Sequence, residues 1–581
     1  MMLISISLLS AAALERYQET ASGFNTRFEG LRTSPMPEYV DEYGEGDEFP
    51  DTPMISRTYA FPYQSVNVQV NQMIWRVFDA QGNYLQTRSE ILPETVIAMQ
   101  PFTFREMRGV TVKINTQVEA NGEVLTLDEL DFDLQGNGMV SLPTSLSPAF
   151  IEAYEVLADN WDYSYLRNLP VARPKMLIIS HTNLAEYQMD FIQWKRQKGF
   201  EVFVINKSEA GSSVQEIHDS IQAHYQEHRA DYLLLLGDTV GSYSIPTNFY
   251  PSPEFAENDA DDNYYALLEG DDYVPEMIVG RFSFNDIMEF IVMATKTIRY
   301  ESAPQMDDPT WMNRALAVAG NYAEGSLRPT TPVWMSRWFR GRMLDYGYTQ
   351  VDTVFYPPSW PGTSSILQSI NQGVGLISYR GWGDANGWHY PRFHIPDMAS
   401  TFNGQKMPIV FSIVCNTGDF ANSVNPSFGE KWMRMGTTAN LGGCVAFVGP
   451  SDLHTKTRLN NSIAAGAYRA ILDYGVRSFG SSVLMGKMEL YKNFVTDLEP
   501  GQYVPFYFHV YNILSDPSMN MWIMQPETIS EGIIEGGLSF AQSASHIRIN
   551  APHLEGAIVS GSKDGENFSY SKVVDGIAIL N

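Results

Sequence analysis

The sequence holds two cysteines, Cys415 and Cys444, that could act as nucleophiles. Cys415 is the last residue of the predicted strand "MPIVFSIVC" and precedes the polar turn "NTGDF". At the mouth of a parallel sheet, backbone N–H groups and access to solvent favour a usable thiolate. Cys415 is therefore a candidate nucleophile, and a core cysteine that ends a strand is the alternative. Cys444 lies in "GGCVAFVG" and reads as a small apolar core residue, with a disulfide to Cys415 as its alternative.

A cysteine nucleophile needs a base, usually a histidine that the fold brings close to it. Two of the ten histidines lie in turns after predicted strands. His389 follows "YRGWGD" and is the first candidate base. His454, in "PSDLHTKT" after "AFVG", is the second, and His394 is a further alternative beside His389.

A competing motif is "HYQEH", His224 to His228, which matches the H-x-x-E-H pattern of some zinc peptidases. Two histidines four residues apart share one helix face and can hold zinc. The same residues fall in the last turn of a predicted helix, where the helix dipole also favours histidine. Zinc chemistry therefore stays as an alternative to cysteine chemistry.

An acidic segment, "ENDADDNYYALLEGDDYVPE", runs from Glu257 to Glu276. Its carboxylates are hard oxygen ligands, which suit calcium better than zinc. No cofactor is required by the cysteine hypothesis, but a structural Ca²⁺ is expected here from four residues: Asp259, Asp261, Asp271 and Asp272. Asp262 is the first candidate to receive a basic substrate side chain. A solvated surface loop is the alternative reading of the whole segment.

The elements that must position these residues form an α/β pattern over residues 173–525. The strand "KMLIIS", the helix "EYQMDFIQWKRQKG", the strand "FEVFVI", a helix that opens at Ser213 and the strand "YLLLLGD" follow in order. This β-α-β-α-β order is typical of a parallel sheet with helices on its faces. The order recurs from "RALAVAGN" to "GLISYRGWGD", so we expect two Rossmann-like halves, with chance similarity of generic βα units as the alternative.

Two β-rich segments flank this domain. Residues 15–172 contain short alternating strands and an Asn-Gly hairpin signal, so they predict a β-rich domain. Residues 526–581 predict a C-terminal segment like a β-sandwich, too short to be a complete one. Residues 1–14 resemble a secretory signal segment, although they lack the usual basic start.

Charge and hydropathy exclude some partners. The formal net charge of -28 argues against nucleic acid, which requires a basic surface. No later segment reaches the roughly 18–20 apolar residues of a membrane span. We expect a soluble protein that is secreted or associated with a cell envelope, and the oligomeric state is not readable from the sequence.

Several motifs, in the same order, are similar to those of the gingipain-type cysteine peptidases of the caspase-like clan. These motifs are "LLLLGD", "DDNYYALLEGDDYVPEMIVGRFS", "YRGWG", "CNTGDF" and "LSDPSM". The resemblance spans about Lys175 to Trp522. It implies a caspase-like catalytic domain between a β-rich propeptide and a β-sandwich, and it implies polypeptide substrates.

The resemblance also implies site residues. The family's catalytic cysteine falls at Cys415, and its oxyanion donors fall at the backbone N–H groups of Gly383 and Cys415. The family's catalytic histidine falls at Trp382, which cannot accept a proton. The role of base therefore passes to His389, with His454 second, and Trp382 and Asp384 become candidate substrate-binding residues.

Three functions follow from this departure. The favoured one is a secreted cysteine endopeptidase that uses Cys415 and a shifted histidine. The second is a pseudopeptidase that binds extended polypeptide without cutting it, because loss of a positioned base costs about 10²–10⁴ in rate. The third is an envelope component for secretion or processing on the same fold.

Overall fold

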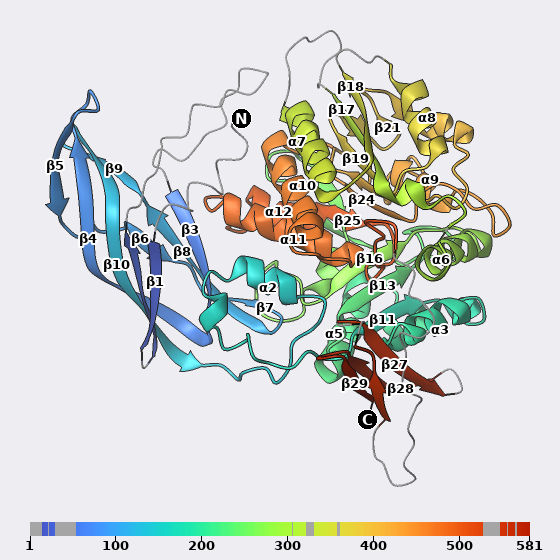
Figure 1. Cartoon of the computed structure of the whole chain (residues 1–581), viewed down its shortest axis with the longest axis horizontal. Coiled ribbons are helices and arrows are strands. Elements are labelled where there is room, and N and C mark those ends of the chain that lie inside the picture. Colours follow the sequence, from blue (N-terminus) through green and yellow to red (C-terminus); the bar gives the residue numbers. More distant parts are fainter. Residues whose placement is uncertain are drawn as a thin grey trace.

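The computed structural model of the chain describes residues 14–20, 22–29, 54–304, 306–320, 331–356, 361–526, 547–552, 554, 556–563 and 566–580. Apart from Leu14, the expected signal segment lies outside these residues. A β-rich domain, a central α/β domain and a small β segment near the C-terminus are seen in Figure 1. Within the described ranges, no helix is long and apolar enough to cross a membrane.

The N-terminal domain contains two antiparallel sheets. The larger has the order β1-β2-β10-β4-β5, with β9 also paired to β10, and the smaller is built around β8. The two predicted strands "SVNVQVN" and "MIWRVFD" are one strand, because no glycine or proline interrupts the alternation between them. The strands are β1 (Leu14–Thr20), β2 (Gly23–Glu29), β3 (Met54–Ala60), β4 (Tyr63–Phe78), β5 (Tyr84–Ser89), β6 (Val96–Ala98), β7 (Phe102–Phe104), β8 (Met107–Asn115), β9 (Gln117–Ala120) and β10 (Glu123–Met139).

The predicted Asn-Gly hairpin is confirmed between β9 and β10. Asn121 and Gly122 have φ values of 55° and 78°, which is the left-handed conformation that this two-residue turn requires. Alternate side chains of β4 and β10 point inward, where Trp75 and Phe132 are fully buried between the two sheets.

The first half of the α/β domain is a parallel sheet in the order β12-β11-β13-β16. The predicted helix start at Ser213 is confirmed. The Ser213 hydroxyl accepts from the Glu216 N–H as part of a capping box. The elements are β11 (Lys175–Ser180), α3 (Met189–Gln197), β12 (Glu201–Asn206), α4 (Lys207–Ala210), α5 (Val214–His228), β13 (Tyr232–Leu236), β14 (Asn248–Pro251), β15 (Asn258–Asp261), β16 (Ile278–Phe282) and α6 (Ile287–Ser302).

The second half is a six-stranded sheet in the order β18-β17-β19-β23-β24-β25, parallel except for β25. Helices α7, α8, α10 and α11 lie around it (Figure 1). The elements are β17 (Arg314–Gly320), α7 (Thr331–Tyr346), β18 (Gln350–Tyr356), α8 (Thr363–Gln372), β19 (Leu376–Arg380), β23 (Ile409–Ser412), α9 (Phe428–Arg434), β24 (Ala446–Pro450), α10 (Thr457–Leu472), α11 (Phe479–Asn493), α12 (Tyr503–Val510) and β25 (Tyr511–Ile513).

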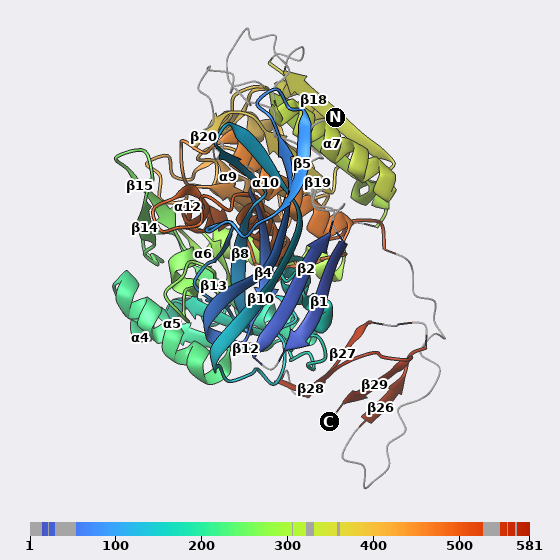
Figure 2. The same cartoon turned by 90° about the vertical axis from the view of Figure 1, so that its left-hand side faces the viewer.

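The C-terminal segment forms two antiparallel pairs, β26 with β29 and β27 with β28. It lies below the α/β domain in Figure 2, close to α3, where the Ser560 hydroxyl donates to the Gln197 carbonyl at 2.8 Å. The strands are β26 (Ile547–Asn550), β27 (Ile558–Lys563), β28 (Glu566–Lys572) and β29 (Ile577–Leu580).

A buried arginine, Arg105, joins the N-terminal domain to the α/β domain. Its guanidinium donates to the carbonyls of Arg229, Ala230 and Glu276 at 2.6–2.9 Å, and to the Asp231 carboxylate at 2.7 Å. Asp231 directly precedes β13, so the arginine sits at the amino end of that strand. Phe102 and Phe104 of the N-terminal domain also belong to the main core of the α/β domain.

Candidate active site

The strand β19 ends at Arg380, and the chain then enters the glycine-rich turn that the sequence singled out. Three short strands fold this turn back on itself: β20 (Gly383–Asp384), β21 (Gly387–Trp388) and β22 (Phe393–His394). The Tyr379 hydroxyl donates to the carbonyl of Trp382 at 2.8 Å and fixes the turn to the end of the strand.

Arg380 ties this turn to the segment that carries the cysteine. Its side chain is fully buried, and its guanidinium donates to the carbonyls of Ile413 and Thr457 and to the Asn461 side chain. Buried arginine is stable only when its donors are satisfied in this way. The end of β19, the start of α10 and the segment after β23 are therefore held together.

Cys415 lies in a turn and not in a strand. β23 ends at Ser412, so the prediction that Cys415 is the last strand residue is wrong by three positions. Asn416 has φ 56° and its N–H donates to the Asp452 carbonyl at 2.7 Å. Gly418 packs so closely that an added Cβ would lie 2.2 Å from the Gly449 carbonyl oxygen.

The Cys415 thiol is buried, with the residue 5% exposed. Its Sγ lies 3.1 Å from the Thr455 hydroxyl. Burial raises the pKa of the thiol to about 11, because a thiolate loses hydration there. In the described part of the chain, the Cys415 N–H makes no backbone hydrogen bond, as an oxyanion donor requires.

His389 is paired with a carboxylate on the same turn. Its Nε2 lies 3.0 Å from the Asp384 Oδ2, within ion-pair distance but outside hydrogen-bond geometry. Its ring lies 4.3 Å from the Trp382 ring and 4.8 Å from the His394 ring. Burial opposes the charge on Asp384, but the contact with His389 leaves the pKa of that carboxyl below its usual value. Burial and the neighbouring His389 lower the pKa of His394, which makes it a poorer base.

Gly383 brings the two turns together. An added Cβ at Gly383 would lie 3.2 Å from side-chain carbons of Val414 and Thr417, on both sides of Cys415 along the chain. The Trp382 side chain remains 38% exposed. The predicted site residues Trp382, Gly383 and Asp384 are therefore on one turn. That turn contacts the turn that carries Cys415, which we call the cysteine turn.

His454 lies close to Cys415 in the fold but is engaged elsewhere. Its Nδ1 lies 2.6 Å from the Glu257 carboxylate, and its ring stacks on Phe255 at 4.0 Å. The next residue, Thr455, is the one that contacts the thiol. His454 is thus paired with a carboxylate, as His389 is, and both histidines stay candidates for the base.

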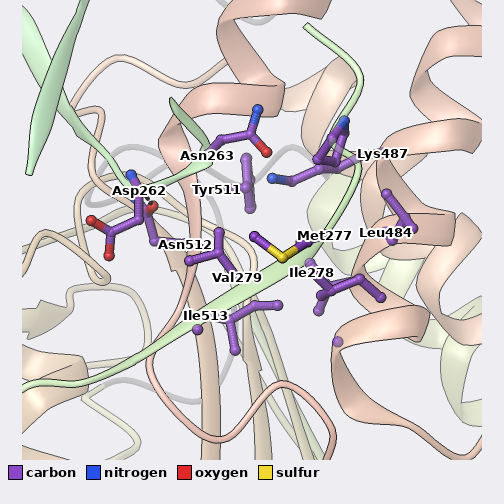
Figure 3. A pocket seen from close by; sticks show the side chains of 14 residues that line it. Asp262, Asn263, Met277, Ile278, Val279, Leu484, Lys487, Tyr511, Asn512 and Ile513 are labelled. Carbon is purple, nitrogen blue, oxygen red and sulfur yellow. Dashed lines mark hydrogen bonds between the residues drawn. The ribbon is translucent and has the colours of Figure 1, made fainter. Parts of the chain in front are cut away.

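Asp262 does not face a substrate. Both of its oxygens accept from the buried Arg281 guanidinium at 2.7 Å, and Thr247 donates to one of them. The neighbouring cavity holds about 20 Å³, room for one water, and Figure 3 shows Asp262 on one side of it and Lys487 on the other. This placement does not fit the prediction that Asp262 receives a basic substrate side chain.

The four predicted calcium ligands point to different partners. Asp261 contacts the His509 ring at 2.9 Å, and Asp272 accepts from the N–H groups of Thr103 and Val274. Asp271 is exposed, whereas Asp259 is buried. These four carboxylates therefore do not assemble into the expected site.

The H-x-x-E-H motif lies on the last turn of α5, as its sequence position suggests. His224 and His228 are 4.5 Å apart between ring centroids, and both pack against Phe203. Within the described residues they join no group of three or more possible metal ligands. Their observed contacts are those of an aromatic packing site.

Cys444 is a free, fully buried core residue, as predicted, and its Sγ lies 3.5 Å from the Met433 sulfur. Thr455 and Asp452, by contrast, are site residues that sequence reasoning missed. Both follow β24, whose carboxyl end neighbours that of β23. The rule that placed Cys415 at a strand end would have pointed to them as well.

Comparison with known proteins places this chain in a family. The family model "Peptidase family C25" matches residues 170–522. Gingipain R2 of Porphyromonas gingivalis (strain ATCC BAA-308 / W83) is 23% identical over 512 residues, which cover 84% of this chain and 65% of the relative. Lys-gingipain HG66 of Porphyromonas gingivalis is 26% identical over 518 residues, which cover 82% of this chain and 28% of the relative. The chain thus spans less than two thirds of these relatives' length.

Solved structures agree on the fold. The crystal structure of the Arg specific cysteine proteinase gingipain R aligns with a TM-score of 0.62 and 21% identity, covering 70% of this chain and 91% of that one. The complex of the Porphyromonas gingivalis pro- and mature domains aligns with a TM-score of 0.61 and 22% identity, covering 70% and 93%. The chain belongs to peptidase family C25, the gingipain-type cysteine peptidases.

Proposed function

We propose that the chain is a cysteine endopeptidase with Cys415 as nucleophile and His389 as base. The observation that carries this proposal is the contact between His389 and Asp384, on a turn that packs against the cysteine turn. A carboxylate beside an imidazole orients the ring and stabilises the imidazolium, as the third member of a catalytic triad does. Trp382, at the position of the family's histidine, packs against the His389 ring with the two ring planes tilted by 30°.

The proposed reaction has two stages. His389 takes the proton of the Cys415 thiol as the sulfur attacks the carbonyl carbon of a peptide bond. The N–H groups of Cys415 and Gly383 stabilise the oxyanion, and the imidazolium protonates the departing amine. Water then attacks the thioester carbon and His389 takes its proton. The C–S bond breaks, the imidazolium returns the proton to the Cys415 sulfur, and the acid product leaves.

The resting thiol requires a local change before it reacts. Sγ contacts Thr455 and is buried, so binding of a polypeptide must turn Sγ from Thr455 toward His389. Catalytic hydrogen bonds are often formed only in the complex with substrate, so this resting geometry is compatible with activity. The exposed Trp382 and the Asp384 carboxylate are the proposed contacts for the substrate.

The test compares turnover of a peptide library by the wild type and by four variants. Cys415→Ser and His389→Ala should each lower kcat/KM by at least 100-fold. His394→Ala is the matched control, because it removes a neighbouring imidazole that has no proposed role. Asp384→Asn should lower kcat more than it raises KM, because it removes the orienting charge.

Two results would separate this proposal from its alternatives. Full turnover by His389→Ala would remove His389 as the base and make His454→Ala the next variant. Binding of a library peptide without cleavage by the wild type would favour the pseudopeptidase. Secretion through the N-terminal segment and maturation between about residues 155 and 175 are part of the proposal, and N-terminal sequencing of the exported protein tests both.

A further inference from the structure

A cluster of acidic side chains and one histidine lies beside the cysteine turn and takes no part in the proposed reaction. Glu257, Asp452 and His454 place their ligand atoms within 4.8 Å of one another. They come from two loops, one before β15 and the other after β24. Elsewhere in the described part of the chain, no other three His, Cys, Asp or Glu side chains come this close.

A further carboxylate, Asp259, lies next to this cluster. It is 8% exposed, and its Oδ2 is buried without a hydrogen-bond partner. The adjacent residue anchors it beside the cluster, because the Ser451 hydroxyl donates to the Ala260 carbonyl at 2.7 Å. After burial, the main influences that raise the pKa of Asp259, to about 7, are the charges of Asp452 and Glu257.

The charge of this cluster is poorly compensated within the protein. Among the described ion pairs, no lysine or arginine contacts Glu257, Asp259 or Asp452. The nearest lysine along the chain, Lys456, is paired with Glu254 at 2.8 Å. Buried carboxylates without a partner are costly unless a cation or a proton neutralises them.

We propose that Glu257, Asp452 and His454, with the buried Asp259 carboxylate beside them, form a site for one divalent cation at the edge of the cysteine turn. The ligand set of one imidazole nitrogen and several carboxylate oxygens fits Zn²⁺, whereas Ca²⁺ prefers oxygen ligands alone. The Nδ1 of His454 and the Glu257 carboxylate, now 2.6 Å apart, would separate by a small rotation to admit the ion.

The cation would act on the segment that contacts the nucleophile. Asp452 and His454 lie next to Thr455, which contacts the Cys415 thiol, and the Asp452 carbonyl accepts from the Asn416 N–H. Binding would therefore fix the loop after β24 against the cysteine turn. The site does not depend on peptide cleavage, so it stands or fails apart from the proposed function.

The test is calorimetric titration of Zn²⁺ into the metal-free full-length protein, with a Ca²⁺ titration in parallel. We expect one equivalent of Zn²⁺ to bind, and at least tenfold weaker binding by His454→Ala and by Asp259→Asn. His224→Ala is the matched control, because it removes a histidine of the competing H-x-x-E-H motif. Circular dichroism of each metal-free variant verifies that it is folded.

The results distinguish the proposed site from the H-x-x-E-H motif, and Zn²⁺ from Ca²⁺. Loss of the Zn²⁺ equivalent in His224→Ala, or unchanged affinity in both cluster variants, would overturn the proposal. Ca²⁺ binding that is tighter than Zn²⁺ binding and insensitive to His454→Ala would also overturn it. X-ray absorption of the Zn²⁺ complex should show only nitrogen and oxygen ligands at about 2.0–2.2 Å, and a sulfur ligand at about 2.3 Å would contradict the assignment.

Discussion

The Cys415 side chain illustrates how burial controls reactivity at the level of one residue. The thiolate is the reactive form, and burial raises the pKa of this thiol to about 11. We predict that alkylation of the resting protein by iodoacetamide at pH 7 is roughly 100-fold slower than that of an exposed cysteine. The rate should rise with pH up to about 11, because deprotonation becomes more complete.

Mass spectrometry of the modified peptide follows this rate at Cys415 alone, and Cys444 serves as an internal reference for a core thiol. A pH-independent, rapid reaction at pH 6–8 would show instead that a thiolate–imidazolium pair already exists without substrate. Addition of a bound peptide should accelerate alkylation if Sγ turns toward His389 on binding.

Lys487 provides a second prediction at this scale. It lies against the small cavity of Figure 3, donates to the Phe508 carbonyl at 2.6 Å, and has its pKa lowered to about 7 by burial. The unfolded chain binds the Lys487 proton more tightly than the folded protein does. The free energy of unfolding of the wild type therefore rises as the pH increases from about 7 to 10. Lys487→Met should therefore be more stable than wild type at pH 6, on the order of 2 kcal/mol, and this advantage should decrease toward pH 10.

Urea unfolding of both proteins at pH 6, 8 and 10 measures this difference. Subtraction of the two curves cancels other groups that titrate in both proteins. A stability difference that does not vary with pH would contradict the lowered pKa of Lys487.

Individual site residues were only partly predictable. The apolar run before Cys415 placed it near a strand end, because that pattern depends on local hydrophobicity. The contact of His389 with Asp384 depends on how the four residues between them fold, and no periodicity encodes that. Asp262 was misassigned because its partner, Arg281, lies on a strand 19 residues away, and a buried ion pair looks like a free charge in the sequence.

At the level of elements, the cysteine turn depends on close backbone contact between Gly418 and Gly449. A Cβ at position 418 would lie 2.2 Å from the Gly449 carbonyl oxygen, so the turn would have to shift. We predict that Gly418→Ala lowers the free energy of unfolding by about 1–3 kcal/mol and lowers peptidase activity further, because Cys415 is displaced.

Gly341→Ala is the control for this variant, because an added Cβ on α7 meets no atom within 4 Å. It should stabilise the protein by about 0.5–1 kcal/mol, since alanine favours helix. Thermal unfolding and turnover of both variants measure the two effects. Wild-type activity in Gly418→Ala would show that the turn tolerates the shift.

The elements were more predictable than the site. β11 was predicted with its observed bounds, because four apolar residues lie between the polar residues Lys175 and Ser180. β23 was predicted too long, because Ile413 and Val414 are apolar yet belong to the turn, where Arg380 holds the Ile413 carbonyl. Apolar residues indicate burial but not the type of element. The end of a buried strand therefore cannot be told from a buried turn that follows it.

At the level of the whole molecule, Arg105 connects two domains. Its guanidinium is satisfied almost entirely by the α/β domain. We predict that Arg105→Ala destabilises the protein by about 3–5 kcal/mol, because it leaves the buried Asp231 carboxylate without its partner. Urea unfolding should then separate into two transitions, one for each domain.

Arg88→Ala is the control, because Arg88 pairs with Glu123 on the surface of the N-terminal domain. It should change stability by less than about 1 kcal/mol. A single cooperative transition in Arg105→Ala, at wild-type stability, would show that apolar contacts alone hold the domains together. The sequence could not show this connection, because nothing in "FREM" distinguishes Arg105 from an exposed arginine. Its partners at the amino end of β13 are distant in the sequence.

The docking of Arg105 also bears on maturation. The contacts described for Arg105 lie at the amino end of β13, and none of them involves the cysteine turn. A cut between residues 155 and 175 would therefore yield a nicked heterodimer whose fragments stay together under native conditions. Native mass spectrometry would register one particle of unchanged mass, apart from added water, while a denaturing gel would resolve two chains. If cutting raises the activity, the cause would then be a change in the packing between the two fragments. It would not be the departure of the N-terminal fragment.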